Sequence, residues 1–235
     1  ESNSKTNVVI DGDVTAKETA IDIDKTGETG ELKLTTNGAL STTDTFNAID
    51  VDLTDSAADL TVTTNDLVDG DVYLKHSRTD GADTTGAKIT MHVNAAFEHE
   101  IDILNRQGGD IDVTLSGTGD LVFDDKYATI YLNSSGYFNP DVGNVALTGD
   151  GQSIYSNFGN FRLVTDHGDV TIKSFGRLEN YSSDNIGVDT EGGNVSISDI
   201  TAVISEAADS IDVESEGGRI SIFDIGTVGA GTDRT

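Results

Sequence analysis

Two segments of the sequence, IGVDTEGGNVSISDI at 186–200 and IDVESEGGRISIFDI at 211–225, repeat one pattern at an interval of 25 residues. A third copy, FRLVTDHGDVTIKSF, begins 25 residues earlier, at Phe161. Each copy reads apolar-x-apolar, then a short polar stretch with a glycine, then apolar-x-apolar again. Alternation with a period of two turns one side of a strand inward and the other toward solvent. Each copy therefore predicts two short strands joined at a glycine corner.

Looser copies of this pattern precede the regular ones, at 21–34, 49–62, 101–113 and 121–132. Strands this short do not form a stable sheet alone, but stacked about 4.8 Å apart they share one continuous core. We therefore predict an all-β fold, a β-solenoid or parallel β-helix-like stack of short strands. The alternative is an antiparallel β-sandwich, especially for residues 1–100, because its strands are spaced similarly. The one helix candidate is a turn or two at 201–209.

We expect a single elongated β domain over residues 1–235. It comprises a polar lead at 1–7, the most regular repeats at 161–225 and a tail at 226–235. Apolar residues make up only 35% of the chain, which favours a thin, layered core over a thick, compact one. The chain has no cysteine, which excludes disulfides and thiol-based sites.

Acidic residues dominate the charge, with 42 Asp and Glu against 14 Lys and Arg, a net charge of −28. Such a surface repels nucleic acid and anionic membranes, so we expect neither as a partner. No apolar run approaches the roughly 20 residues that a membrane span needs. Three explanations of the acidity stay open: solvation at high salt, binding of divalent cations, and solubility of a crowded assembly.

Calcium is the one cofactor that the sequence suggests. Ca²⁺ takes six to eight oxygen ligands, often from Asp side chains at turns, and stacked turns place such corners in columns. The same residues are also common in plain turns, which is the competing interpretation. The candidate ligands are Asp11, Asp13, Asp69, Asp71, Asp80, Asp83, Asp110 and Asp112.

We predict no catalytic site. Polygalacturonase-like β-helix enzymes carry four short motifs, and this chain has only partial matches at 64–66, 124–125, 166–168 and 218–221. A polysaccharide-degrading enzyme using Asp124 and Asp125 is therefore a minor alternative. The histidines show no paired spacing typical of a metal site. Sequons at Asn133, Asn180 and Asn194 leave glycosylation open.

The short IDV…GGxIxI units resemble the β-solenoid domains of bacterial and archaeal surface proteins, including filamentous-haemagglutinin-like regions and adhesin domains built from GDIxVxxxxGxI units. The resemblance implies a cell-surface or secreted protein that acts through adhesion or assembly. It brings no catalytic residues to this chain.

From these features we predict a secreted structural protein, a self-assembling subunit of an extracellular filament, sheath or surface layer. Its copies would join through strand edges and terminal segments. The alternative is a cell-surface adhesin that binds carbohydrate or a host surface. A run of aromatic residues would serve that role or fill a wider stretch of core, and it comprises Tyr127, Tyr131, Tyr137, Phe138, Tyr155, Phe158 and Phe161.

Overall fold

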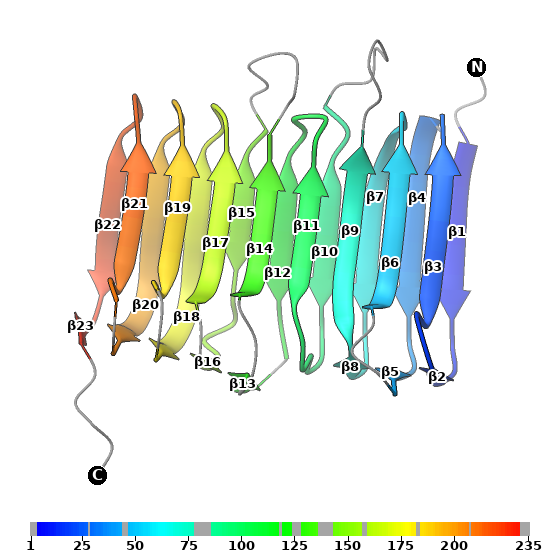
Figure 1. Ribbon diagram of the computed structural model, residues 1–235, viewed down its shortest axis with the longest axis horizontal. Coiled ribbons are helices and arrows are strands. Elements are labelled where there is room, and N and C mark those ends of the chain that lie inside the picture. Colours follow the sequence, from blue (N-terminus) through cyan, green and yellow to red (C-terminus); the bar gives the residue numbers. More distant parts are fainter. Residues whose placement is uncertain are drawn as a thin grey trace.

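The computed structural model describes residues 4–27, 29–43, 47–77, 86–117, 119–123, 128–135, 143–156, 159–181, 184–206 and 208–230. Within these ranges every regular element is a β-strand, and every pair of neighbouring strands runs parallel. The chain winds into an elongated β-solenoid with β1 at one end and β22 at the other (Figure 1). The predicted fold class is confirmed, and the antiparallel sandwich considered for residues 1–100 is wrong.

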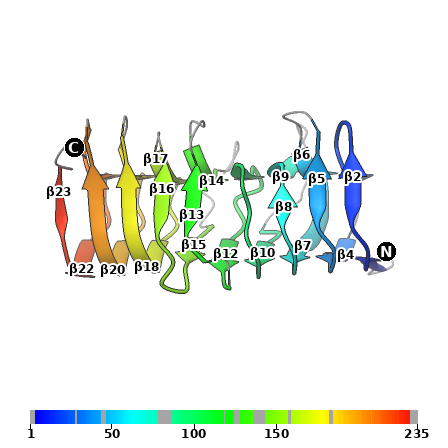
Figure 2. The same cartoon turned by 90° about the horizontal axis from the view of Figure 1, so that it is seen from below.

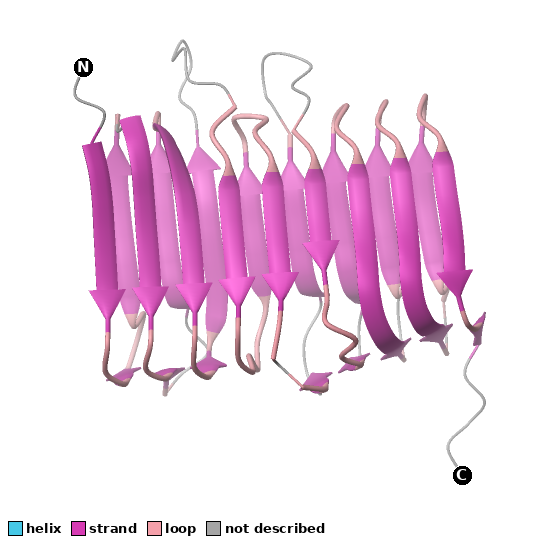
Figure 3. Cartoon of the chain, turned by 180° about the vertical axis from the view of Figure 1, so that it is seen from behind, coloured by secondary structure: helices cyan, strands magenta, loops and turns pink. Residues whose placement is uncertain are grey.

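Each turn of the solenoid passes through three faces. The first face is at the back of Figure 1 and at the front of Figure 3. Its strands are β1 (Ser4–Ile10), β4 (Thr29–Thr36), β7 (Ala57–Thr64), β10 (Ile89–Val93), β12 (Ile111–Leu115), β15 (Val145–Thr148), β18 (Val170–Asn180), β20 (Val195–Ser205) and β22 (Ile220–Ile225).

The second face lies at the front of Figure 1 and forms one eight-stranded sheet. Its strands are β3 (Ile21–Thr26), β6 (Asn47–Thr54), β9 (Asp71–Ser77), β11 (Ile101–Asn105), β14 (Ala128–Ser134), β17 (Gly159–Thr165), β19 (Ile186–Thr190) and β21 (Ile211–Ser215).

The third face is narrow and is seen from below in Figure 2. Because β18 and β20 continue around the corner from the first face, their second halves also belong to this face. The remaining strands of the third face are β2 (Val14–Ala16), β5 (Leu40–Thr42), β8 (Val68–Asp69), β13 (Leu121–Phe123), β16 (Ile154–Ser156) and β23 (Val228–Ala230).

The core consists of inward columns of aliphatic side chains. Val170 and Ile172 are fully buried, whereas Thr171 between them points outward and is half-buried. Val170 pairs with Val145 on one side and Val195 on the other, so like side chains stack from turn to turn. Parallel strands in register therefore turn the apolar-x-apolar pattern into continuous buried columns.

The repeat interval is the length of one turn in the C-terminal part of the stack. Phe161 pairs with Ile186, and Ile186 pairs with Ile211, each 25 residues further along. Earlier turns differ in length, since Ile49 pairs with Val72 after 23 residues. Corner loops of different length absorb these differences while the strands keep their register.

The helix predicted at 201–209 is wrong. Residues 201–205 belong to β20, where Ala202 pairs with Arg177 and Val203 with Leu178 of β18. The neighbouring turn offers this segment backbone partners and a buried apolar column. Tertiary pairing thus overrides the local helical preference.

Glycines form a column at the corner between the second and the first face. A Cβ atom on Gly193 would collide with the carbonyl oxygen of Gly168, and one on Gly168 would collide with that of Gly143. Backbones of successive turns therefore approach too closely at this corner for any side chain. The spacing of glycines in the repeat reflects this contact.

A second column marks the corner between the first and the third face. Ser174, Asp199 and Asp224 follow one another at 25-residue intervals and have φ angles of 67°, 54° and 54°. These are left-handed conformations, in which Ser and Asp are less favoured than Gly. The bend lets β18 and β20 pass from one face to the next.

Candidate functional site

Asp11 and Asp13, two of the predicted calcium ligands, lie at the corner after β1 and accept hydrogen bonds from the next turn. Asp11 Oδ1 accepts one from Asn37 Nδ2 at 2.7 Å, and Asp13 Oδ1 accepts one from the Ala39 N–H at 2.9 Å. Asn37 Oδ1 accepts in turn from Asn65 Nδ2 at 2.8 Å. Asp11 thus belongs to a ladder of polar side chains, and Asp13 bonds the backbone of the next turn, so both carboxylates link successive turns.

Asp110 belongs to another ladder, at the start of the first-face strands. Its Oδ1 accepts the N–H of Asn144 at 2.8 Å, and Asn144 Oδ1 accepts the N–H of Asp169 at 2.9 Å. Asp112 lies two residues further, on the outer side of β12, with its Oδ2 3.4 Å from Lys88 Nζ. Each carboxylate therefore has a donor from a neighbouring turn.

Asp69 and Asp71 lie beside His99 and Glu100 of the following turn. Asp69 Oδ1 is 3.0 Å from His99 Nε2, and Asp71 Oδ1 accepts the N–H of Glu100 at 3.1 Å. These contacts again connect one turn with the next.

The last predicted pair, Asp80 and Asp83, lies outside the described residues. In the part of the chain that the structure describes, no three His, Asp or Glu side chains gather so that they could hold a metal ion. The described aspartates act as hydrogen-bond acceptors between turns. Calcium binding stays a prediction.

The segments considered for polysaccharide hydrolysis lie apart. Residues 64–66 begin at the last residue of β7, residues 166–168 lie at the corner between β17 and β18, and residues 218–221 include the first two residues of β22 at the far end. Several turns of the stack separate the first of these segments from the last. Asp124 and Asp125 lie outside the described residues.

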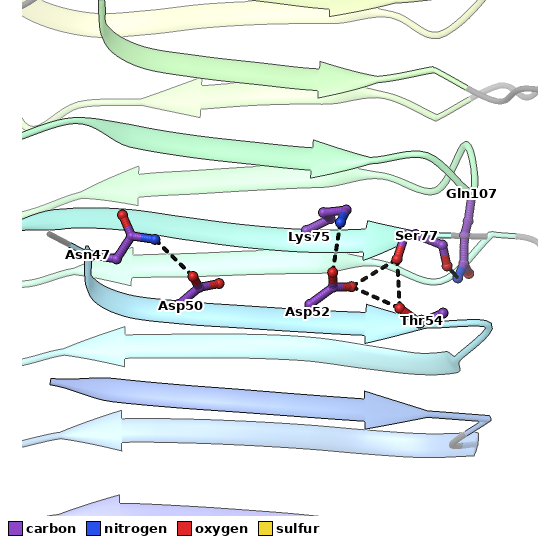
Figure 4. Close-up of polar contacts among 7 residues, drawn as sticks. All are labelled: Asn47, Asp50, Asp52, Thr54, Lys75, Ser77 and Gln107. Carbon is purple, nitrogen blue, oxygen red and sulfur yellow. Dashed lines mark hydrogen bonds and ion pairs between the residues drawn. The ribbon is translucent and has the colours of Figure 1, made fainter. Parts of the chain in front are cut away.

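Figure 4 shows a polar network on the outer side of β6 and β9. Asp52 accepts hydrogen bonds from Lys75 Nζ at 2.7 Å, from Ser77 Oγ at 2.8 Å and from Thr54 Oγ1 at 3.1 Å. Burial raises the pKa of Asp52, but the bonds from Lys75 and Ser77 outweigh it and bring the pKa below its usual value. The network holds an ion pair between adjacent turns.

Beside this network is a cavity of about 250 Å³ on the second face. Burial raises the pKa of Asp102 to about 6, and its Oδ1 is buried with no hydrogen-bond partner among the described residues. Burial also raises the pKa of Asp50, although the hydrogen bond from Asn47 at 2.9 Å opposes this. Such a lining can both donate and accept hydrogen bonds. The cavity is lined by Asn47, Asp50, Asp71, Val72, Tyr73, Glu100 and Asp102.

His76 is fully buried in an inward column of the second face, between Leu53 and Asn105. Neither of its ring nitrogens has a hydrogen-bond partner among the described residues. Burial lowers the pKa of His76 to about 4, so the ring is neutral at pH 7. This histidine is a core residue of the second face.

The predicted aromatic run divides between core and surface. Phe161 is 2% exposed, and its ring centroid lies 4.9 Å from that of Phe175. Tyr131 and Tyr155 lie half-buried on the outside of β14 and β16. Tyr127, Tyr137, Phe138 and Phe158 lie outside the described residues.

The two end turns hold the large apolar side chains that are most exposed in the described part of the molecule. Ile222 is 45% exposed, whereas Ile197, which pairs with it one turn earlier, is fully buried. Val9 in β1, at the other end, is 49% exposed. The other exposed apolar residues at the C-terminal end are Ile220, Phe223 and Val228.

The acidic cavity was not evident from the sequence. Asp50 and Asp102 each look like an ordinary outward residue between two apolar ones. The register of the parallel strands places Asp50 and Asp102 on either side of Tyr73. The turn from Asp50 to Tyr73 has 23 residues, and the turn from Tyr73 to Asp102 has 29. A search at one fixed interval does not find such a group.

Comparison of the chain with protein-family models, with curated proteins and with solved structures found no match. Across the described ranges, no helix has the length and apolar character needed to cross a membrane. The end turns and the acidic cavity are therefore the features from which a function can be inferred.

Proposed function

We propose that this protein is an extracellular structural subunit whose copies assemble end to end into a filament, sheath or layer. The observation that carries the proposal is the position of the exposed apolar side chains. Among the described residues, all the large apolar side chains with 45% or more exposure lie in the first or the last turn. Soluble proteins rarely expose apolar groups together unless another surface covers them. The extracellular setting follows from the resemblance to solenoid surface proteins alone.

Strand edges at both ends support the same proposal. Within the described chain, β1 pairs only with β4, and β22 pairs only with β20. One edge of each strand thus presents backbone N–H and C=O groups without a neighbouring strand. Such edges are templates for pairing with another chain.

Val9 and Phe223 make the two ends complementary. Both are outward residues of the same column on the first face, and they are 49% and 50% exposed. If a second copy continues the stack in register, its Val9 lies beside Phe223 and both leave water. Between these two residues the column is polar and holds Thr35, Thr63, His92, Thr114, Thr148, Lys173 and Ser198.

A joint of this kind uses two different surfaces of the subunit. Such heterologous contacts build open filaments when the rotation between copies does not close a ring. The order of strands on the first face would then continue across every joint.

The test is electron microscopy and sedimentation velocity of the purified chain over a concentration series, with and without calcium. We expect rods that lengthen with concentration. Phe223→Ser, which places a serine where the preceding turn has Ser198, should raise the concentration needed for assembly. Lys173→Ser, in the same column two turns before Phe223, is the matched control and should assemble like the parent chain. A chain that stays monomeric at high concentration in all conditions contradicts the proposal.

The acidic cavity favours a second candidate function, an adhesin that binds carbohydrate. Tyr73 offers an aromatic surface between Asp50 and Asp102, which is a combination that suits sugar hydroxyls and ring faces. A glycan-binding screen tests this function, with Tyr73→Ala as the site variant. Tyr155→Ala, on the third face, is the control. No bound glycan, or equal binding by both variants, counts against the adhesin.

A further inference from the structure

We propose that the open edge of β21 binds an extended segment of a partner protein, one that carries basic residues and adds a strand to the second face. Among the described strands, the first face has nine and the second face has eight. β22 therefore lies one strand position beyond β21, as the left-hand end of Figure 1 shows. This open position belongs to each single copy and does not depend on end-to-end assembly.

The backbone of β21 can pair on its open side. Within the described chain, β21 pairs only with β19. The N–H of Ile186 in β19 donates to the carbonyl oxygen of Ser210, just before β21, at 3.3 Å. Ile211 occupies the place of Ile186 one turn later, so its N–H points to the open side, as does that of Val213. A parallel strand laid there would continue the hydrogen bonding of the sheet.

The apolar side chains opposite this position lack a cover. Ile220 and Ile222 are inward residues of β22, because they continue the columns of Val195 and Ile197. Val195 and Ile197 are 1% and 0% exposed, whereas Ile220 and Ile222 are each 45% exposed. In each earlier turn a second-face strand follows the first-face strand, as β21 follows β20. An added strand with two inward apolar residues would cover Ile220 and Ile222 in the same way.

The outward residues of β21 decide the charge of the partner. Asp212 and Glu214 are exposed and alternate with the inward residues Ile211 and Val213. Asp189 precedes Glu214 in the same column. Basic residues at the two matching positions of the added strand would lie directly beside these carboxylates. A second copy of this chain suits the position poorly, because its net charge is −28 and its own last repeat places acidic residues there.

The corner after β21 selects the residue that ends the added strand. Thr190 Oγ1 donates a hydrogen bond to the carbonyl oxygen of Gly168 at 3.5 Å, and Ser215 Oγ donates one to that of Gly193 at 3.4 Å. Gly218 occupies the place of Gly193 one turn later. A Thr or Ser at the fifth position of the added strand would reach the carbonyl oxygen of Gly218. The segment recognised therefore reads apolar-basic-apolar-basic, followed by Thr or Ser.

End-to-end assembly would leave this position open. If β1 of a second copy lies beside β22, β3 of that copy lies two strand positions beyond β21, so one strand fits between them. Asp22 and Asp24 of β3 are exposed and would border the other side of that strand. A basic segment would thus have acidic neighbours on both sides at every joint.

The experiment measures binding of fluorescent peptides to the purified full chain by anisotropy. The probe is Ile-Lys-Val-Lys-Ser-Glu-Gly-Gly, which copies residues 211–218 with lysine at the two outward positions. We expect saturable binding. The unchanged repeat, Ile-Asp-Val-Glu-Ser-Glu-Gly-Gly, should bind at least about tenfold more weakly, since two opposite-charge contacts become like-charge contacts. Ile-Val-Lys-Lys-Ser-Glu-Gly-Gly keeps the composition of the probe but loses the alternation, and should not bind.

Variants of the chain locate the binding position. Asp212→Lys with Glu214→Lys should reverse the preference between the lysine peptide and the acidic peptide. Ile222→Ser should weaken binding of the lysine peptide by about tenfold, because an apolar contact is lost. Phe223→Ser is the matched control, since this neighbouring side chain points outward on the first face, and it should bind like the parent chain.

N-methylated peptides test the backbone pairing. Methyl groups on the two lysine nitrogens would face β21 and should abolish binding, whereas methyl groups on the isoleucine and valine nitrogens would point away from β21 and be tolerated. No binding of the lysine peptide, equal binding of the acidic peptide, or loss of binding with Phe223→Ser overturns the inference. Because each result is obtained on single copies, below any concentration that gives rods, failure of the chain to assemble would count against the proposed function alone.

Discussion

The hydroxyl of Thr190 accepts a hydrogen bond from the backbone N–H of Gly193 at 3.1 Å, and thereby closes the corner between β19 and β20. Thr165 with Gly168 and Ser215 with Gly218 repeat this bond at the same interval. The polar residue that ends each of these second-face strands is thus part of the corner. In each of the three repeats it is Thr or Ser, and the glycine that it bonds follows three residues later.

Gly193→Ala should destabilise the protein strongly, because the added Cβ collides with the carbonyl oxygen of Gly168. We expect a loss of about 3 kcal/mol in the free energy of unfolding, at the upper end for overpacking a buried site. Urea denaturation measures it. Gly217→Ala is the control, since a Cβ there makes only ordinary contacts, and it should change stability little. Equal effects of the two substitutions would refute the close approach of the turns.

Substitutions of Asp110 test whether this residue acts only as a hydrogen-bond acceptor between turns or also as a calcium ligand. Asp110→Asn keeps the Oδ1 that accepts the Asn144 N–H and should leave stability nearly unchanged, whereas Asp110→Ala should cost about 1 kcal/mol. Denaturation with and without EDTA measures both. If EDTA destabilises the parent chain and Asp110→Asn removes that effect, the residue is a calcium ligand after all.

Asp199→Gly should stabilise the protein, by about 1 kcal/mol, because glycine adopts the φ of 54° without a steric penalty. Asp199→Val should destabilise it for the opposite reason, since β-branched residues avoid this region. Thermal melts of the two variants provide the comparison. A loss of stability in the glycine variant would mean that the Asp199 side chain contributes more than its backbone costs.

His76 should make stability depend on pH between about 4 and 6.5. Its pKa is lowered to about 4 in the folded state, so below pH 6.5 the unfolded chain binds a proton that the folded chain does not. This contribution is fully present above pH 6.5 and is lost as pH falls toward 4. The loss amounts to about 3 kcal/mol at 1.36 kcal/mol per pKa unit.

His76→Leu tests this dependence, because Leu53 already occupies the same column one turn earlier. The variant should be more stable than the parent chain at pH 5, and the difference should shrink toward pH 7. Urea unfolding at several pH values measures it. A difference that does not change with pH would show that the ring titrates normally.

Asp102 should make the stability depend on pH in the opposite direction to His76. Its pKa is raised to about 6, so its contribution is present below the unfolded value of 3.8 and is lost as pH rises through 6. Asp102→Asn should therefore stabilise the protein at pH 7, by about 1 kcal/mol once solvent screening of this partly exposed group is allowed for. An NMR titration of the carboxyl carbon would check the pKa directly. A value near 4 would contradict the effect of burial.

The regular turns were predictable from sequence because each contains the same apolar-x-apolar pairs at one interval. Phe161, Ile186 and Ile211 could be aligned by counting alone. The third face was harder to recognise, because its strands, such as Val68–Asp69, are too short to show alternation.

The polar side chains that link turns were also beyond sequence reasoning. Asn37 and Asn65 are 28 residues apart, and Asn94 follows after a further 29, so no fixed interval connects them. Their relation appears only when the strands between them are in register. For the same reason the hydrogen bonds that Asp11 and Asp13 accept from the next turn could not be predicted from the sequence.

Because every strand pair is parallel, the solenoid has a direction, and its two tips are chemically different. One tip presents Val9 and the other Phe223. A growing fibre of such subunits would be polar, with separate rates of addition at its two tips. A variant altered at only one tip could still add to a fibre through the other, and would then act as a chain terminator that sets fibre length.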